Sequence, residues 1–267
     1  LTTKYLVFIL LLSFFYKKYK LTNSNIYVIL SLIVVLLNIT IIFGDNRADF
    51  IVPAIVSMIL FYKMYPFQGK IASIIIIIFI ILITSLISAH RDNQSYTGGE
   101  NPVVDFAQTL QVYMGGPYNV ALAIETAEVN PESRTFFNFS YDMLRPAIGL
   151  NVLLKGLDLK MANEHFNERY FYSDTYSQII PMVGQGYFYF GFFGSPLIII
   201  LFLVLARFIF SVIIKQSRIE LIFFLGIPLT RFGLAMGQNG SILINDTTFF
   251  LILNLGIYYV NKKISFK

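Results

Sequence analysis

The segment NEHFNERYFYSDTYS gathers side chains that can move protons and hold sugars. It contains three candidates for a general base, namely His165, Glu168 and Asp174. A histidine, or a carboxylate with a raised pKa, can take a proton from a hydroxyl group. Arg169 and Tyr170 lie between these candidates, and tyrosine rings suit the CH faces of sugars. The alternative is a solvated loop whose tyrosines belong to an aromatic belt at a membrane interface.

Three arginines are candidates for binding a phosphate or pyrophosphate group. Arg47 occurs in GDNRADF, Arg145 in an apolar part of a long polar loop, and Arg231 in PLTRFG. A guanidinium offers rigid bidentate donors and keeps its charge in partly dry surroundings. We expect all three to face one cavity that opens outward from a membrane.

Each arginine also has an alternative role, because a charge near apolar segments is commonly paired or reaches toward water. Arg47 has Asp45 and Asp49 beside it, and Arg231 precedes Asp246 by fifteen positions. Arg145 needs only to extend its side chain out of the apolar segment. The residue types alone leave both roles open.

Other chemistries have little support in the residue types. Two histidines, no cysteine and no HExxH pattern argue against a metal site, and no cofactor is expected. A phosphate-binding GxxxxGK[ST] loop is missing from the sequence, and the basic residues are dispersed, so neither nucleotide hydrolysis nor nucleic-acid binding is indicated. The glycines of GQGYFYFGFFG favour close helix packing through small residues.

The elements that must hold these residues are predicted to be membrane helices. Hydrophobic residues make up 56% of the chain and charged residues 13%, with a mean hydropathy of +0.68. Because a membrane-spanning helix needs roughly 20 apolar residues, the long runs predict an all-α polytopic membrane protein with about seven spanning helices. The predicted runs are Tyr5–Tyr16, Ile26–Phe43, Phe50–Tyr65, Ile71–Ala89, Tyr187–Ile213, Ile219–Met236 and Ile242–Val260.

The charges predict which side of the membrane each connection faces. Residues 90–180 carry eleven acidic and six basic side chains, whereas the rest of the chain carries four acidic and fourteen basic ones. Every second connection is basic, which indicates a cytoplasmic location for those connections and for the carboxyl terminus. This parity predicts a multi-pass membrane protein.

The chain is thereby divided into three parts that we expect to form one functional unit. Residues 1–89 are predicted to form four spanning helices, residues 90–180 a structured extracytoplasmic loop, and residues 181–267 three further helices. Parity places Leu1 outside and no initiator methionine is present, so we expect a further amino-terminal portion.

Within the loop, recurrent aromatic and apolar residues indicate folded structure rather than disorder. Short helices are predicted over Asp105–Tyr113 and Tyr118–Ala127, separated by a Gly-Gly-Pro breaker. The segment Phe136–Leu154 is apolar, but Asp142, Arg145 and Pro146 argue against an ordinary span. An interfacial or re-entrant helix is therefore expected there.

Three motifs resemble those of bacterial O-antigen or capsular repeat-unit polymerases, the Wzy-type family. They are GDNRADFIVPAIVSMILFY, with an outward arginine before a helix; VYMGGPYNVA, with an aromatic-Gly-Gly element that contains Tyr113; and YSQIIPMVGQGYFYFGFFGSPL, with a Gly-aromatic-Phe-Gly entry into a helix. Together they extend over residues 44–197, and the fold implied by the resemblance is that of a membrane-embedded (GT-C-like) glycosyltransferase.

The resemblance implies polymerisation of undecaprenyl-pyrophosphate-linked repeat units at the outer face of the inner membrane, without a metal. On this hypothesis Arg47, Arg145 and Arg231 hold the donor pyrophosphate, while His165, Glu168 or Asp174 deprotonates the acceptor. Arg169, Tyr113 and Tyr170 are expected to contact the glycan. A flippase and a chain-length regulator are the expected protein partners.

Two alternative functions fit parts of the same pattern. An O-antigen ligase uses the same lipid-linked donor but transfers a finished glycan. A polysaccharide transporter or flippase would instead place charged residues along a path through both leaflets. Here the charges at membrane depth cluster toward the outer side, which favours an enzyme of the outer face.

Overall fold

The computed structural model describes residues 2–41, 48–92, 116–170, 179–233 and 238–263. These residues form twelve α-helices and one short 3₁₀ helix, and no strand is found in the ranges described. The predicted all-α class is confirmed for this part of the chain. The elements are α1 (Thr2–Thr22), α2 (Asn25–Thr40), α3 (Ala48–Met64), α4 (Gly69–Asp92), α6 (Pro117–Val129), η1 (Pro131–Ser133), α7 (Phe136–Leu144), α8 (Leu150–Leu154), α9 (Ala162–Tyr170), α10 (Met182–Gly194), α11 (Leu197–Ile214), α12 (Ile219–Gly233) and α13 (Gly240–Lys263).

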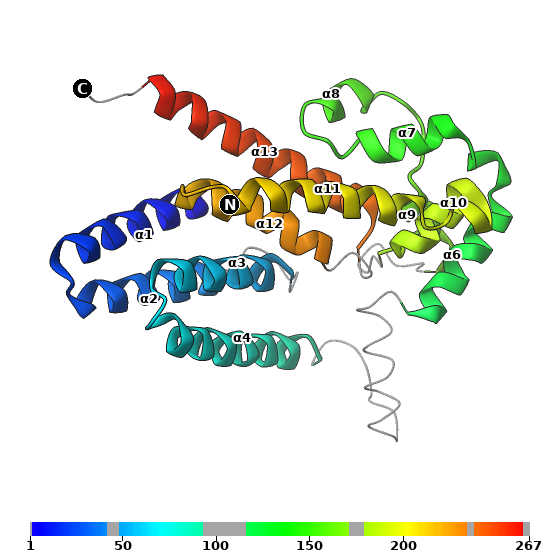
Figure 1. The fold of residues 1–267 in the computed structure, drawn as a ribbon. Coiled ribbons are helices and arrows are strands. Elements are labelled where there is room, and N and C mark those ends of the chain that lie inside the picture. The colour runs from blue at the N-terminus through cyan, green and yellow to red at the C-terminus, as the bar shows by residue number, and fades with distance from the viewer. Residues whose placement is uncertain (1, 42–47, 93–115, 171–178, 234–237, 264–267) are drawn as a thin grey trace. The chain divides into compact units, whose positions relative to one another are not determined.

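The chain separates into two compact units, and residues 1–97 and 213–230 make up the first. Here α1 packs on α2, α2 on α3, and α3 on α4, while Tyr5 and Phe8 of α1 contact the ring of Phe223 in α12. A Cβ added at Gly226 would lie 2.7 Å from a methyl carbon of Val56, so α12 approaches α3 closely at this glycine. The first unit is thus a bundle of apolar helices (Figure 1).

Membrane-spanning potential is strongest in α11. Of the helices in the described ranges, only α11 is both long and apolar enough to cross a membrane by length and composition, with a mean hydropathy of 3.1. Shorter apolar helices cover Asn25–Thr40, Ile51–Met64, Gly69–Ile83 and Gly240–Leu253. Only 17% of the α11 window is buried, unlike the core helix of a soluble domain.

The fifth apolar run, Tyr187–Ile213, is predicted to form one continuous helix, but the structure shows a break within it. The helical path breaks at Gly191, whose φ of 69° and ψ of −167° lie outside the helical region, and α11 begins only at Leu197. A Cβ at Gly186 would collide with the carbonyl oxygen of Ser195. The run therefore folds back on itself, which a glycine-free sequence could not do so tightly.

The second unit comprises residues 98–212 and 231–267. Its α6 confirms the short helix predicted over Tyr118–Ala127, and Pro117 occupies the first turn, where its missing N–H costs nothing. The helix predicted over Asp105–Tyr113 lies outside the described residues.

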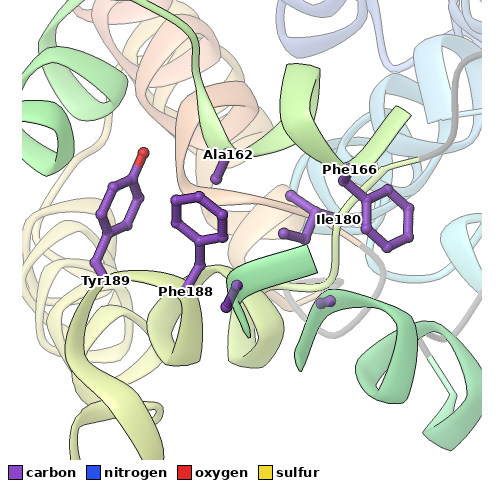
Figure 2. Close-up of a cluster of buried hydrophobic side chains, with 7 residues drawn as sticks. Ala162, Phe166, Ile180, Phe188 and Tyr189 are labelled. Carbon is purple, nitrogen blue, oxygen red and sulfur yellow. The ribbon is translucent and has the colours of Figure 1, made fainter. Parts of the chain in front are cut away.

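Helices α6, α9 and α10 pack around a buried apolar cluster (Figure 2). The cluster consists of Ala123, Ala127, Ala162, Phe166, Ile180, Phe188 and Tyr189. A Cβ at Gly184 would collide with the Cβ of Ala123, so α10 and α6 meet through small residues. Close packing through the glycines of this segment is confirmed.

The prediction of one continuous helix over Phe136–Leu154 is wrong. Helix α7 ends at Leu144, since Pro146 cannot continue a regular helix, and Gly149 takes a positive φ of 93° before α8 begins. The backbone N–H of Ile148 donates to the hydroxyl of Thr248 at 3.2 Å. The segment is thus two short helices joined by a turn that lies beside α13.

Candidate functional site

Helix α9 carries most of the described residues that the sequence singled out for acid–base chemistry. Its start is capped by Glu164, whose Oε2 accepts a hydrogen bond from the backbone N–H of Met161 at 2.7 Å. Ala162 and Phe166 are fully buried and turn one face of α9 into the apolar cluster. The opposite face is polar, which leaves its charged side chains available to other groups.

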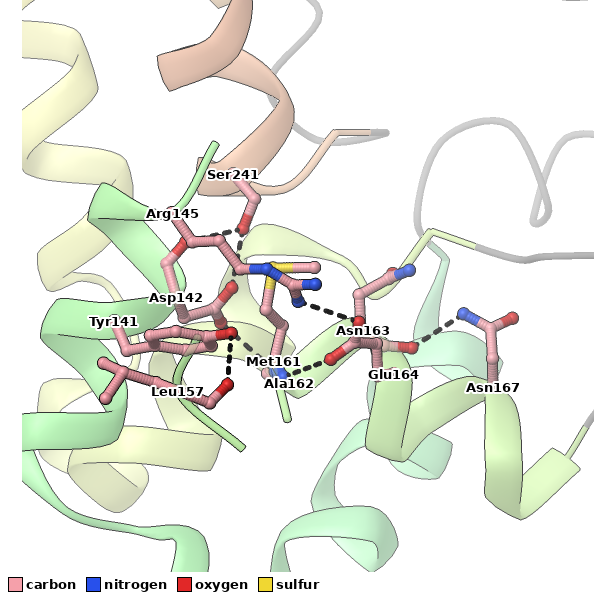
Figure 3. A network of polar contacts seen from close by, with 10 residues as sticks. All are labelled: Tyr141, Asp142, Arg145, Leu157, Met161, Ala162, Asn163, Glu164, Asn167 and Ser241. Carbon is pink, nitrogen blue, oxygen red and sulfur yellow. Dashed lines mark hydrogen bonds and ion pairs between the residues drawn. The ribbon is translucent and has the colours of Figure 1, made fainter. Parts of the chain in front are cut away.

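Arg145 lies beside this polar face (Figure 3). Its Nη1 is 3.0 Å from Oε1 of Glu164, and its guanidinium carbon lies 5.5 Å from the centre of the Tyr141 ring. Both partners of the ion pair are about one-third exposed, so the pair itself is worth at most ~1 kcal/mol. The structure brings the predicted phosphate-binding residue Arg145 next to the predicted acid–base segment.

His165 is half-buried and stacks on the ring of Phe188, with 5.7 Å between ring centres and 27° between planes. Desolvation lowers the pKa of His165, and the opposing charge of Glu168 offsets only part of that effect. The imidazole is consequently neutral at physiological pH. A neutral imidazole can accept a proton, as a general base must.

The other members of the predicted constellation are less centrally placed or lie outside the described ranges. Glu168 pairs with Lys160 at 2.8 Å, and Arg169 pairs with Glu125 of α6 at 3.2 Å. Tyr170 is the last residue of α9, and nothing is described of its side chain. The predicted site residues Arg47, Tyr113 and Asp174 are outside the described residues.

Arg231 takes the pairing that the sequence offered as its alternative role. Its Nε lies 2.8 Å from Oδ2 of Asp246 in α13, and both side chains are largely buried. Both residues belong to the second unit, and an ion pair in such surroundings is costly to break because each charge then loses a close partner of opposite sign.

Among the described residues of the second unit, Asp142 is the most buried acidic or basic side chain. In the sequence it indicates only that its segment is not an ordinary membrane span. Its side chain is fully buried and accepts hydrogen bonds from four groups. The donors are Ser241 Oγ at 2.7 Å, Tyr189 Oη at 2.8 Å, Gln185 Nε2 at 2.9 Å and the backbone N–H of Ala162 at 3.3 Å. Burial raises the pKa of Asp142 despite these four donors.

Further contacts extend this arrangement into a network. Gln185 Oε1 accepts from the backbone N–H of Gly240 at 2.8 Å, and Asn163 Oδ1 accepts from that of Ile180 at 2.8 Å. The network therefore connects α7, α9, α10 and the start of α13. Because Asp142 has no exposed surface, its role is to position these elements, including Arg145 one turn further along the chain.

The sequence offered one indication that Asp142 is important, namely that it is an acidic residue within the apolar stretch FFNFSYDML. A buried carboxylate requires donors, and the sequence contained no indication of which distant residues would supply them. In the described ranges, no group of three or more His, Cys, Asp or Glu residues is arranged to hold a metal ion.

Comparison of the chain with protein-family models, with curated proteins and with solved structures finds no match.

Proposed function

We propose that this chain is a membrane-embedded glycosyltransferase that polymerises undecaprenyl-pyrophosphate-linked oligosaccharide repeat units at the outer face of the bacterial inner membrane. The observation that carries the proposal is the proximity of Arg145 to α9, where Glu164 contacts the arginine and the next residue is the half-buried His165. One segment thereby combines a cation for a phosphate group with a base for a sugar hydroxyl.

In this proposal the chain is polytopic, with about seven spanning helices. The support for this is the exposed apolar surface of α11, the shorter apolar helices, and the separation of basic and acidic residues between alternate connections. The short helices would reach across the hydrocarbon by extension of their ends or by local thinning of the bilayer.

The turn after α7 supports a re-entrant position for this part of the loop. Thr248, which binds the N–H of Ile148, lies eight residues after Gly240, so the turn reaches about 12 Å along α13 from its start. Val152 and Leu153 of α8 are 76% and 78% exposed. Contact with lipid would remove the free-energy cost of exposing these apolar side chains to water. Helix α8 would then line the path of the polyprenyl chain.

The proposed reaction is a transfer of the growing glycan. The acceptor hydroxyl oxygen attacks the anomeric carbon of the donor, the bond from that carbon to the pyrophosphate oxygen breaks, and the pyrophosphate leaves with the bonding electrons. His165 takes the proton of the acceptor hydroxyl, with Glu168 and Asp174 as the other candidate bases. Arg145 stabilises the charge on the leaving group, since its contact with Glu164 uses only one of five N–H donors. Arg47 and Arg231 are proposed to assist it.

The test is a deletion of the gene in its host, followed by gel analysis of the surface polysaccharide. Loss of a polymerase leaves single repeat units attached, whereas loss of a ligase leaves no glycan attached. Complementation with Arg47→Lys, Arg145→Lys and Arg231→Lys should shorten the glycan, because lysine keeps the charge but loses the bidentate fork. Unchanged glycan length in all three variants would refute the pyrophosphate role.

A further inference from the structure

Four phenylalanines of the second unit are strongly exposed and form what we call the aromatic patch. Phe136 and Phe137 begin α7 and are 76% and 62% exposed, while Phe192 and Phe193 follow the break at Gly191 and are 76% and 92% exposed. Fully exposed phenylalanines are costly in water and need an apolar neighbour.

Ring contacts connect the start of α7 to Phe190, the residue before the break at Gly191. The ring of Phe139 lies 6.0 Å from that of Phe136 and 4.7 Å from that of Phe190, centre to centre. The guanidinium of Arg134 lies 5.7 Å from the centre of the Tyr187 ring. The start of α7 therefore packs against the segment that turns at Gly191, and the two pairs extend from the two segments that meet there.

The position of this surface follows from its distance along the chain to α11. Phe193 precedes Leu197, the first residue of α11, by four positions. A span needs roughly 20 residues to cross the hydrocarbon, and α11 supplies 18, so the proposed crossing would put its amino-terminal end at the edge of the hydrocarbon. Phe193 would then lie in the layer of lipid headgroups.

We propose that the aromatic patch inserts into the headgroup layer of the outer leaflet and fixes the second unit against the membrane surface. Aromatic rings are enriched at this depth, and Arg134 beside them suits the lipid phosphates. Lipid is the occupant because Phe193 lies only four positions before α11, whose apolar surface is largely exposed. Anchoring here keeps the polar face of α9 near the level at which a lipid diphosphate is presented.

The proposal rests on one part of the proposed function, the crossing of the membrane by α11, and does not depend on the reaction. The chain contains no tryptophan, so a single introduced tryptophan is an unambiguous fluorescent reporter. We would compare Phe193→Trp in the patch, Phe208→Trp eleven residues into α11, and Glu128→Trp at an exposed position of α6. Each full-length variant is reconstituted into phosphatidylcholine vesicles containing either a headgroup nitroxide lipid or a lipid brominated at mid-chain.

The Phe193→Trp variant should be quenched at least about twofold more by the headgroup nitroxide than by the bromolipid, and Phe208→Trp should show the reverse order. Glu128→Trp should respond to aqueous iodide and to neither lipid. If Phe208→Trp responds to the bromolipid while Phe193→Trp responds to neither lipid, the anchoring is wrong although α11 crosses the membrane. If Phe208→Trp also fails to respond, the membrane crossing and the anchoring both fail. The three tryptophan variants could show the expected quenching while deletion of the gene leaves the surface glycan unchanged. That result would contradict only the proposed reaction and not the anchoring.

Discussion

The hydroxyl of Ser241 donates a hydrogen bond to Oδ1 of Asp142 at 2.7 Å, although the two residues are 99 positions apart. The same hydroxyl is 3.2 Å from the backbone carbonyl oxygen of Asp142. This contact attaches α7 to the first turn of α13. The predicted extracytoplasmic loop is therefore built on the last long helix of the chain rather than suspended between two helices.

Replacing Asp142 should destabilise the second unit more than any exposed acid does. Asp142→Ala leaves the buried hydroxyl of Tyr189 and the buried amide of Gln185 without their carboxylate acceptor, at an expected cost of about 3 kcal/mol or more. Thermal unfolding in detergent measures this cost. The matched control is Asp158→Ala at an exposed position, which should change stability by less than ~0.5 kcal/mol.

The raised pKa of Asp142 also predicts a pH dependence of stability. Below about pH 3.9 the carboxyl is protonated in both states, and above it the unfolded carboxyl ionises first. The free energy of unfolding should therefore fall with rising pH until the pH exceeds the folded-state pKa. Asp142→Asn removes this titration, so a comparison of unfolding midpoints across pH should show a weaker slope in the variant. Equal slopes would contradict a raised pKa.

Separating Arg231 from Asp246 should be costly, whereas removing both charges should not. Arg231→Met removes the close cationic partner of the largely buried carboxylate of Asp246, with an expected loss of about 3–5 kcal/mol in the free energy of unfolding. The double variant Arg231→Met with Asp246→Leu should recover most of that loss in the same unfolding assay. The double variant could be folded and still produce no polymer. In that case Arg231 has a role in the reaction besides its ion pair with Asp246.

The close contact between α10 and α6 predicts that a larger residue at position 184 can be compensated by a smaller one at position 123. Gly184→Ala should cost about 1–3 kcal/mol, because the added methyl collides with Ala123. Adding Ala123→Gly should restore part of the stability by returning the space. Gly156→Ala is the control, since a Cβ there meets nothing within 4 Å, and it should be nearly neutral.

His165 predicts the pH profile of the transfer reaction. Because its pKa lies below 6.5, activity on lipid-linked repeat units should stay constant as the pH falls to about 6.5 and decline only below that value. Glu168→Gln removes a neighbouring charge that raises the pKa of His165, so the decline should begin at a still lower pH. Abolished activity in Glu168→Gln, with His165→Gln active, would assign the base to Glu168 instead.

Local features of the chain could be predicted where they depend only on the residues of one short segment. The helix over Pro117–Val129 follows from a proline after two glycines and a run of helix formers, and the apolar character of α11 follows from composition. The break at Gly191 was missed, because hydropathy is averaged along the chain and does not report a single residue with positive φ. The interruption of Phe136–Leu154 was missed in part for the same reason, at Gly149.

What the sequence by itself determined is the all-helical class and the alternation of apolar and charged segments, since both follow from residue types over short stretches. Only the tertiary structure decided the surroundings of Asp142, whose side-chain donors lie 43, 47 and 99 positions away. It likewise placed Arg145 beside Glu164 and stacked His165 on Phe188. The physical reason is that a buried carboxylate requires donors of hydrogen bonds but does not specify their place in the chain, which the packing of α7, α9, α10 and α13 alone defines.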